Sequence, residues 1–206
     1  MAKDSSSNAW RRHQDSDQYV KRAQAEGWRS RAIYKLSEIH ERESLMRRGA
    51  NVLDLGAAPG AWSQYASKIV GPGGRVIAVD LLPIDAIAEV EIIEGDFRDE
   101  EILNKVLHCI GNDRFDLVMS DMAPNITGTR SVDQPRSMYL AELAADLASR
   151  VLVRRGAFVV KLFHGEGFDQ FVRDMRQQYE TVRVRKPKAS RVQSRETYLV
   201  ARNIRL

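Results

Sequence analysis

The feature that most constrains this chain is a series of short apolar segments that alternate with helical patterns. The apolar segments lie at 51–56, 75–80, 90–96, 115–121 and 157–163. Nearly continuous apolar strands of this kind are typical of a parallel sheet covered by helices on both faces. Two further strands, at 181–186 and 196–202, are separated only by a short basic loop. This favours an antiparallel return, because a parallel crossover needs about a dozen residues or more.

The expected helices fill the intervals between these strands. They cover 17–26, 29–42, 62–70, 100–110 and 167–178, with a long helix before the fifth strand that Asp133 caps and that has Pro135 in its first turn. The polar, serine-rich stretch 1–15 is expected to be a mobile arm, and 16–206 a single domain. The sequence therefore predicts an α/β fold with a seven-stranded, mostly parallel sheet.

Charge is distributed unevenly along the chain. Residues 1–50 carry 11 basic and 7 acidic side chains, residues 51–172 carry 11 and 18, and residues 173–206 carry 10 and 3. Basic ends around an acidic middle suggest that a polyanion contacts the ends, although basic side chains also serve simply as a solvated surface. The terminal segments hold Trp10 and Trp28 and the basic strip 183–195, which suit base stacking and phosphate contacts.

The most specific local signal is the segment 52–62, VLDLGAAPGAW, in which a strand enters a glycine-rich turn and then a helix. Gly56 and Gly60 allow a ligand to approach the backbone closely. The spacing is not the G-x-G-x-x-G of a dinucleotide site, and the G-K-[ST] of a P-loop is absent. The pattern D-x-G-x-x-P-G instead resembles the first motif of S-adenosylmethionine-dependent methyltransferases.

Three carboxylates follow successive strands, at the edge where doubly wound sheets bind ligands. Asp80 ends the second strand and is expected to accept both ribose hydroxyls of a nucleoside. Asp96 follows the third strand and is expected to accept from an adenine amino group, and Asp121 follows the fourth. Any one of them would by itself be read as a turn or cap residue. Together they indicate one pocket for a ligand that carries a sulfonium and no phosphate.

A longer set of motifs resembles the RlmE (FtsJ/RrmJ) family of large-subunit ribosomal RNA 2′-O-methyltransferases. The motifs are GWRSRAIYKLSEI, VLDLGAAPGAWSQY, DLLP, GDFRDE, SDMAPNITG, FVVKLFHGEGFD and RKPKASRVQSRETYLVA, and they follow in the family's order. The resemblance implies a Rossmann-like methyltransferase fold and S-adenosyl-L-methionine as cofactor. It implies the catalytic set Lys35, Asp121, Lys161 and Glu196, and the cofactor-binding residues Gly60, Trp62, Asp80, Asp96 and Asp121.

Lys161 also stands out without the family, because it interrupts the apolar strand AFVVKLF, where an unpaired charge is costly. A ribose hydroxyl is a weak nucleophile, so we expect Lys161 to act as the base or to stabilise the developing alkoxide. Asp121 and Glu196 are then expected to orient Lys161, and Lys35 to position the hydroxyl. Without the resemblance, Lys35 and Glu196 would be read as ordinary surface residues.

The implied substrate is a uridine in the A-loop of 23S rRNA within an assembled 50S subunit. Alternatives are a 2′-O-methyltransferase for tRNA or an mRNA cap, a ribosome-assembly factor without catalysis, a base amino-group methyltransferase and a dehydrogenase. The last two are disfavoured by the motif DMAPN, which lacks the aromatic residue of base methyltransferases, and by the glycine spacing. We further expect a cytoplasmic monomer with no metal site, no disulfide, no secretory signal and no membrane span.

Overall fold

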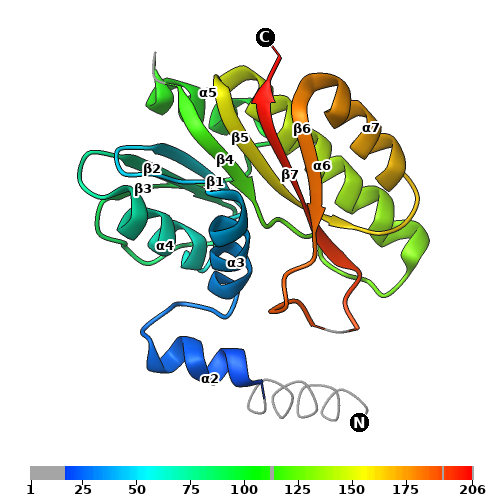
Figure 1. The fold of residues 1–206 in the computed structure, drawn as a ribbon, viewed down its shortest axis with the longest axis horizontal. Coiled ribbons are helices and arrows are strands. Elements are labelled where there is room, and N and C mark those ends of the chain that lie inside the picture. The colour runs from blue at the N-terminus through cyan, green and yellow to red at the C-terminus, as the bar shows by residue number, and fades with distance from the viewer. Residues whose placement is uncertain (1–16, 112–113, 192, 206) are drawn as a thin grey trace.

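Seven strands form one sheet in the order β3-β2-β1-β4-β5-β7-β6, as Figure 1 shows for the computed structural model. The structure describes residues 17–111, 114–191 and 193–205. The strands are β1 (Asn51–Leu55), β2 (Arg75–Asp80), β3 (Val90–Glu94), β4 (Phe115–Ser120), β5 (Leu152–Phe163), β6 (Tyr179–Arg185) and β7 (Glu196–Ile204). Strands β1 to β5 pair in parallel, and β7 is antiparallel to both β5 and β6. The predicted fold class is therefore confirmed.

Helices cover both faces of this sheet (Figure 1). They are α2 (Gln18–Ala25), α3 (Ile33–Glu43), α4 (Ala61–Val70), α5 (Glu100–Ile110), α6 (Arg130–Val151) and α7 (Phe168–Gln178). Helices α3 and α4 pack on one face, and α5, α6 and α7 on the other. None of the helices in the described ranges is both long and apolar enough to span a membrane.

The two faces of the sheet have separate cores because successive strand residues point in opposite directions. In β1, Leu53 and Leu55 join the core beneath α5, α6 and α7, whereas Val52 joins the core beneath α3 and α4. In β5, Val159 and Ala157 face α3 and α4 in the same way. The period of two therefore places Lys161, two residues after Val159, on the α3 and α4 face at the carboxyl end of β5.

Several element boundaries differ from the sequence prediction. Helix α6 begins at Arg130 with Thr129 as its N-cap residue, so Asp133 is not the cap. The carboxylate of Asp133 instead accepts hydrogen bonds from the backbone N–H groups of Thr127 and Gly128, each at 2.9 Å. This fixes the loop ahead of the helix, and Pro135 then lies beyond the first turn.

Strand β5 begins at Leu152, five residues before the predicted start. Leu152 pairs with Phe115, and the register then shifts so that Ala157 pairs with Leu117. The bulge carries Gly156, where an added Cβ would lie 2.8 Å from the carbonyl oxygen of Val153. The glycine therefore belongs to a bulged strand and does not end a connection, as the sequence had suggested. Helix α3 is also shorter than predicted, beginning at Ile33, and the expected arm 1–15 lies outside the described residues.

Candidate active site

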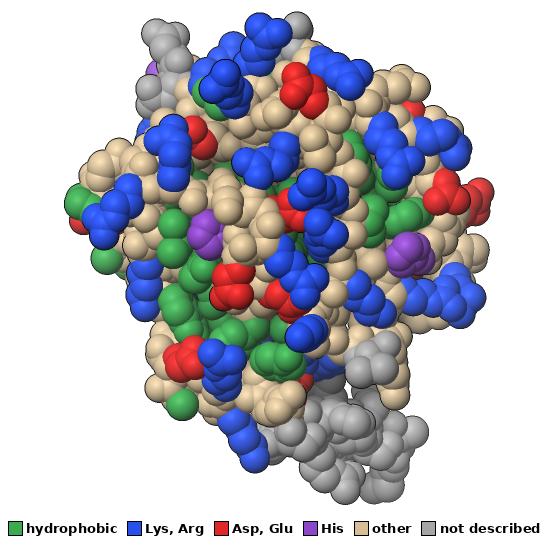
Figure 2. All heavy atoms as spheres, in the orientation of Figure 1, with side chains coloured by type: hydrophobic (Ala, Val, Ile, Leu, Met, Phe, Trp, Pro, Cys, Tyr) green, Lys and Arg blue, Asp and Glu red, His purple; other side chains and the backbone are tan. Residues whose placement is uncertain are grey.

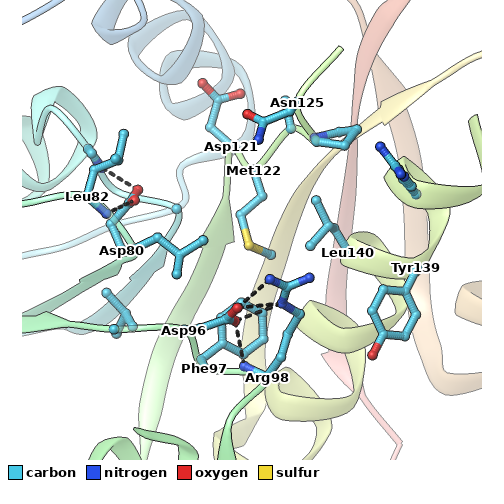
Figure 3. Close-up of a pocket in the computed structure, with 18 residues that line it drawn as sticks. Asp80, Leu82, Asp96, Phe97, Arg98, Asp121, Met122, Asn125, Tyr139 and Leu140 are labelled. Carbon is cyan, nitrogen blue, oxygen red and sulfur yellow. Dashed lines mark hydrogen bonds and ion pairs between the residues drawn. The ribbon is translucent and has the colours of Figure 1, made fainter. Parts of the chain in front are cut away.

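A cavity of about 630 Å³ opens at the carboxyl edge of the sheet, beside the point where the strand order reverses between β1 and β4 (Figure 3). This is the position at which doubly wound sheets bind ligands. The walls come from the turn after β1, the ends of β2, β3 and β4, and helix α6. All three carboxylates predicted from the strand ends line it, namely Asp80, Asp96 and Asp121.

Gly56 forms the floor of the turn after β1. Its φ is +75°, and a Cβ at this position would lie 2.3 Å from Cγ of Met122. Only glycine fits this close approach. Gly60 behaves differently, because it precedes α4 with a φ of +100° but does not line the cavity. An added Cβ there would lie 2.7 Å from Cδ1 of Ile87, so Gly60 shapes the loop that surrounds the cavity.

Asp80 anchors the wall formed by β2. Its Oδ2 accepts from the backbone N–H of Ala58 at 2.8 Å, and its Oδ1 accepts from the backbone N–H of Leu82 at 2.8 Å. Each carboxylate oxygen can accept two hydrogen bonds, so each retains one free acceptor position. Asp80 is therefore fixed in orientation and still able to receive two hydroxyl donors, as a ribose would present.

Asp96 lines the cavity but is bound there by Arg98. Oδ1 and Oδ2 of Asp96 each lie 2.8 Å from Nε of Arg98, and Nη2 of Arg98 also donates to Oδ2. The hydrogen bonds from Arg98 hold the pKa of Asp96 below its ordinary value. Sequence reasoning singled out Asp96 but gave no sign that Arg98 would bind it.

The donor set of the cavity fits a nucleoside ligand without phosphate. The cavity is lined by three carboxylates and by two arginines, Arg98 and Arg136, but the turn after β1 contributes only Gly56 and Ala58. Phosphate sites instead gather lysine or arginine at such a turn. Carboxylates at the ends of β2, β3 and β4 suit hydroxyl, amino and cationic groups, which are the groups of S-adenosyl-L-methionine.

Next to this cavity, Lys161 and Asp121 form a buried ion pair. Nζ of Lys161 lies 3.0 Å from Oδ1 of Asp121 and also donates to the backbone carbonyl oxygen of Asp121. Burial by itself would raise the pKa of Asp121, but the positive charges of Lys161 and Lys35 and the hydrogen bond from Tyr198 lower it further than burial raises it. Asp121 is therefore held as a carboxylate, and its partner Lys161 lies at the end of β5 beside the cavity.

Lys35 and Glu196 form a second ion pair, with Nζ of Lys35 2.7 Å from Oε1 of Glu196. Lys35 comes from helix α3 and Glu196 begins strand β7, so the pair joins distant parts of the chain. Glu196 was expected to orient Lys161, but the structure pairs it with Lys35. The cause is the antiparallel ladder, in which Glu196 lies opposite Phe163 and not opposite Lys161.

Tyr198 connects the two ion pairs, and the sequence analysis did not identify it. It lies opposite Lys161 in the β5–β7 ladder and is fully buried. Its hydroxyl donates to Oδ1 of Asp121 at 2.6 Å, and Nζ of Lys35 lies 5.8 Å from the centre of its ring. The signal that could have found it is the strand period, since Tyr198 is two residues after Glu196 and points to the same face.

Trp62 packs against Tyr198 of this cluster and does not line the cavity. It is buried, its Nε1 donates to the carbonyl oxygen of Ala32 at 2.8 Å, and its ring centre lies 5.6 Å from that of Tyr198. The structure thus brings the predicted catalytic residues together, whereas Gly60 and Trp62 lie behind the wall of the predicted cofactor site.

Asp54 is a further buried carboxylate on the same face of the sheet. Its Oδ2 accepts from the hydroxyl of Ser63 at 2.6 Å, whereas its Oδ1 has no hydrogen-bond partner in the described part of the chain. Burial raises the pKa of Asp54 to about 7, the Ser63 hydrogen bond opposes this rise, and the charges of Asp121 and Asp80 add to it. Asp54 therefore adds one protonatable carboxyl to the charged residues of the site.

A doubly wound sheet, a cavity lined by three carboxylates and a buried lysine at the end of β5 together define a methyltransferase of the class that uses S-adenosyl-L-methionine. Residues 28–204 match the family model described as FtsJ-like methyltransferase. A protein of Cellvibrio japonicus (strain Ueda107) named ribosomal RNA large subunit methyltransferase E is 53% identical over 202 residues, 98% of this chain and 96% of that protein. The chain belongs to the FtsJ-like methyltransferase family.

Solved structures agree with this fold. A structure from Plasmodium falciparum described as a ribosomal RNA methyltransferase superposes with a TM-score of 0.77 and 24% identity, covering 86% of this chain and 98% of that one. A methyltransferase from Streptococcus mutans, solved in complex with SAH, gives 0.51 and 12% and covers 78% and 90%. At these identities the likeness concerns the fold alone.

Proposed function

We propose that this enzyme transfers a methyl group to the ribose 2′-hydroxyl of a uridine in the A-loop of 23S rRNA, within the 50S subunit. Methylation of large-subunit ribosomal RNA is the activity named for its 53% identical relative. The observation that carries the ribose assignment is the buried Lys161–Asp121 pair, which Tyr198 links to the Lys35–Glu196 pair. Transfer to oxygen needs a group that removes the hydroxyl proton or stabilises the developing alkoxide, and we assign this role to Lys161.

S-adenosyl-L-methionine supplies the electrophilic methyl group when it is bound. Asp80 would hold its ribose, Asp96 its adenine amino group, and Asp121 the edge of the cavity nearest Lys161. As the neutral amine, Lys161 would accept the hydroxyl proton at Nζ; as the ammonium, it would instead stabilise the developing alkoxide while the hydroxyl proton passes to water. Asp121 fixes the position of Nζ through two contacts, the carboxylate and its own carbonyl oxygen.

Lys35 and Glu196 would position the target ribose. Their side chains are 13% and 12% exposed, so they reach the surface at the point where the ion pairs meet solvent. Both line a second cavity of about 1080 Å³ between α2, the start of α3 and the loop before β7. That cavity also contains Lys188 and Arg191, which offer cationic partners to an RNA strand, whereas Arg31 in the same wall is paired with Asp17.

The basic surface extends around this second cavity. Figure 2 shows Lys and Arg side chains spread over the face that carries α3 and the end of the chain. Phosphate neutralisation by such a surface supplies most non-specific affinity for nucleic acid. The substrate is bulky, and the catalytic pairs lie at the rim of this face, so we further propose that the enzyme acts as a cytoplasmic monomer on the assembled subunit.

The test uses purified protein, radiolabelled S-adenosyl-L-methionine and 50S subunits from cells that lack this enzyme. Nuclease digestion and mass spectrometry then locate the methyl group on base or ribose. We expect one 2′-O-methyluridine in the A-loop, little transfer to free 23S rRNA, and a loss of at least about a hundredfold in Lys161→Ala.

The matched control is Arg154→Ala, which removes an exposed cation at the opposite end of the same strand, β5. It should retain the activity of the unchanged enzyme. Methylation of tRNA or capped RNA in place of 50S subunits would reassign the substrate. A Lys161→Ala variant that restores subunit assembly in cells without methylating RNA would instead identify a non-catalytic assembly factor.

A further inference from the structure

Within the cofactor cavity, Asp96 is already bound by a side chain of the protein itself. Asp96 follows strand β3, and Arg98 follows two residues later in the same turn. Figure 3 shows the guanidinium group of Arg98 beside Asp96, on the side of the cavity that faces Met122 and Leu140. An arginine therefore lies where the sequence analysis expected only an open acceptor for adenine.

The contacts use most of the hydrogen-bonding capacity of the Asp96 carboxylate. Oδ1 accepts from the backbone N–H of Arg98 at 3.0 Å and from its Nε at 2.8 Å. Oδ2 accepts from the same Nε at 2.8 Å and from Nη2. Because Nε carries one hydrogen, which the two oxygens share, three N–H groups of Arg98 bind the carboxylate, out of about four that it can accept. Asp80 in the same cavity receives only one donor on each oxygen and keeps two positions free.

An adenine amino group that approaches Asp96 from the cavity meets the guanidinium of Arg98, which lines the same cavity and contacts both carboxylate oxygens. We propose that the Arg98 side chain competes with the adenine amino group of the cofactor for Asp96, and that this competition weakens cofactor binding. The inference depends on the assignment of Asp96 to adenine in the proposed function, but not on the identity of the RNA substrate. Arg98 would therefore act on cofactor binding indirectly, through its contacts with Asp96.

The competition is weak enough for the cofactor to prevail. The side chain of Arg98 is 46% exposed, so the guanidinium can exchange its contacts with Asp96 for water. Exposed ion pairs contribute only a fraction of a kilocalorie to about 1 kcal/mol, which corresponds to a factor of about two to five in affinity. The backbone N–H of Arg98 can keep its bond to Oδ1 while the side chain moves, so Asp96 stays oriented.

Calorimetric titration with S-adenosylhomocysteine tests the proposal without any RNA or methyl transfer. Arg98→Met retains an unbranched chain of similar length and removes every side-chain donor. We expect it to bind about two- to fivefold more tightly than the unchanged protein. The control Arg154→Met, an exposed arginine at the far end of β5, should leave the affinity unchanged. Unchanged or weaker binding in Arg98→Met would overturn the proposal, since it would mean that the guanidinium does not oppose adenine.

Two further titrations locate the effect at the amino group. S-inosylhomocysteine carries an oxygen where adenine has its amino group, so Arg98→Met should bring no gain with this ligand. In an Asp96→Ala background, which leaves neither the guanidinium nor adenine an acceptor at this position, Arg98→Met should also bring no gain with S-adenosylhomocysteine. An equal gain with both ligands, or in both backgrounds, would contradict a competition at Asp96. If the RNA assignment is wrong, these affinities are unaffected, so the two proposals fail separately.

Discussion

Replacing Lys161 with methionine removes the positive charge that faces Asp121 and keeps most of the side-chain volume. Both side chains are largely buried, with 8% of Lys161 and 19% of Asp121 exposed, and Nζ lies 3.0 Å from Oδ1. The variant therefore leaves a buried carboxylate without its nearest counter-charge. We expect this change to destabilise the folded protein as well as to abolish methyl transfer.

The magnitude follows from the partners that remain. Breaking a buried ion pair by removing one member costs about 3–5 kcal/mol, because the other charge stays desolvated. Asp121 would keep the hydrogen bond from Tyr198 and part of the field of Lys35, which places the expected loss near the lower limit, at about 3 kcal/mol. For a domain of this size, that loss lowers the melting temperature by roughly 6–12 °C.

The pH dependence gives the loss a second signature. In the unchanged protein the pKa of Asp121 lies below its ordinary value, so the pair stabilises the fold at neutral pH and this contribution is lost as the pH falls. In Lys161→Met, burial without the lysine raises the pKa of Asp121. The native variant then takes up a proton readily, so its disadvantage relative to the unchanged protein is largest at pH 7 and decreases toward pH 4.

Urea unfolding at pH 7 and pH 4.5 measures both quantities. The double variant Lys161→Met, Asp121→Asn provides the control, because it removes the unpaired charge and should recover most of the stability lost at pH 7. A loss below about 1 kcal/mol in the single variant would refute the reasoning. So would a double variant that is no more stable than the single one, because the loss would then come from packing and not from charge.

Three other perturbations test separate parts of the site. Tyr198→Phe removes the donor to Oδ1 of Asp121 but keeps the ring against Trp62, so we expect kcat to fall about tenfold with KM little changed, and a Tyr198→Leu variant to lose stability as well. Asp54→Asn removes a carboxyl whose pKa is raised to about 7. Such a carboxyl stabilises the fold less as the pH rises from about 4 to 7, so urea unfolding should show the variant gaining about 3 kcal/mol relative to the unchanged protein across that range. A difference that stays constant with pH would contradict burial of the proton. Lys188→Ala and Arg191→Ala should each weaken 50S binding and reduce its salt dependence, measured by filtration at several KCl concentrations, while Arg154→Ala should change neither.

The parallel part of the fold could be predicted because its determinants are local. Segments such as 76–79 and 117–119 are apolar at every position, as a strand buried on both faces requires. Asp80, Asp96 and Asp121 could be assigned to one cavity for the same reason, since parallel strands bring their carboxyl ends to one edge. The sequence therefore predicted that these three carboxylates share one cavity, but not how each of them is held.

The features that could not be predicted depend on contacts between distant segments. The early start of β5 follows from pairing of Leu152 with Phe115, and the N-terminus of α6 follows from a loop that Asp133 binds. Asp96 is bound by Arg98 only because the turn after β3 directs both side chains the same way. Propensity and period describe single elements, and none of them specifies which partner a side chain finds across a turn or between strands.

The uneven distribution of charge along the chain now has a structural explanation. The carboxylates of the cofactor cavity all come from the acidic middle of the sequence, whereas Lys35 and Glu196 come from its basic ends. The Lys161–Asp121 pair is formed by the middle and the Lys35–Glu196 pair by the two ends, and Tyr198 contacts both. The cluster is complete only when β7 pairs with β5 and α3 packs on the sheet, so the proposed catalytic geometry depends on both contacts. A variant that loosens β7 should therefore lose methyl transfer before it loses cofactor binding, because Asp80 and Asp96 lie on the opposite half of the sheet.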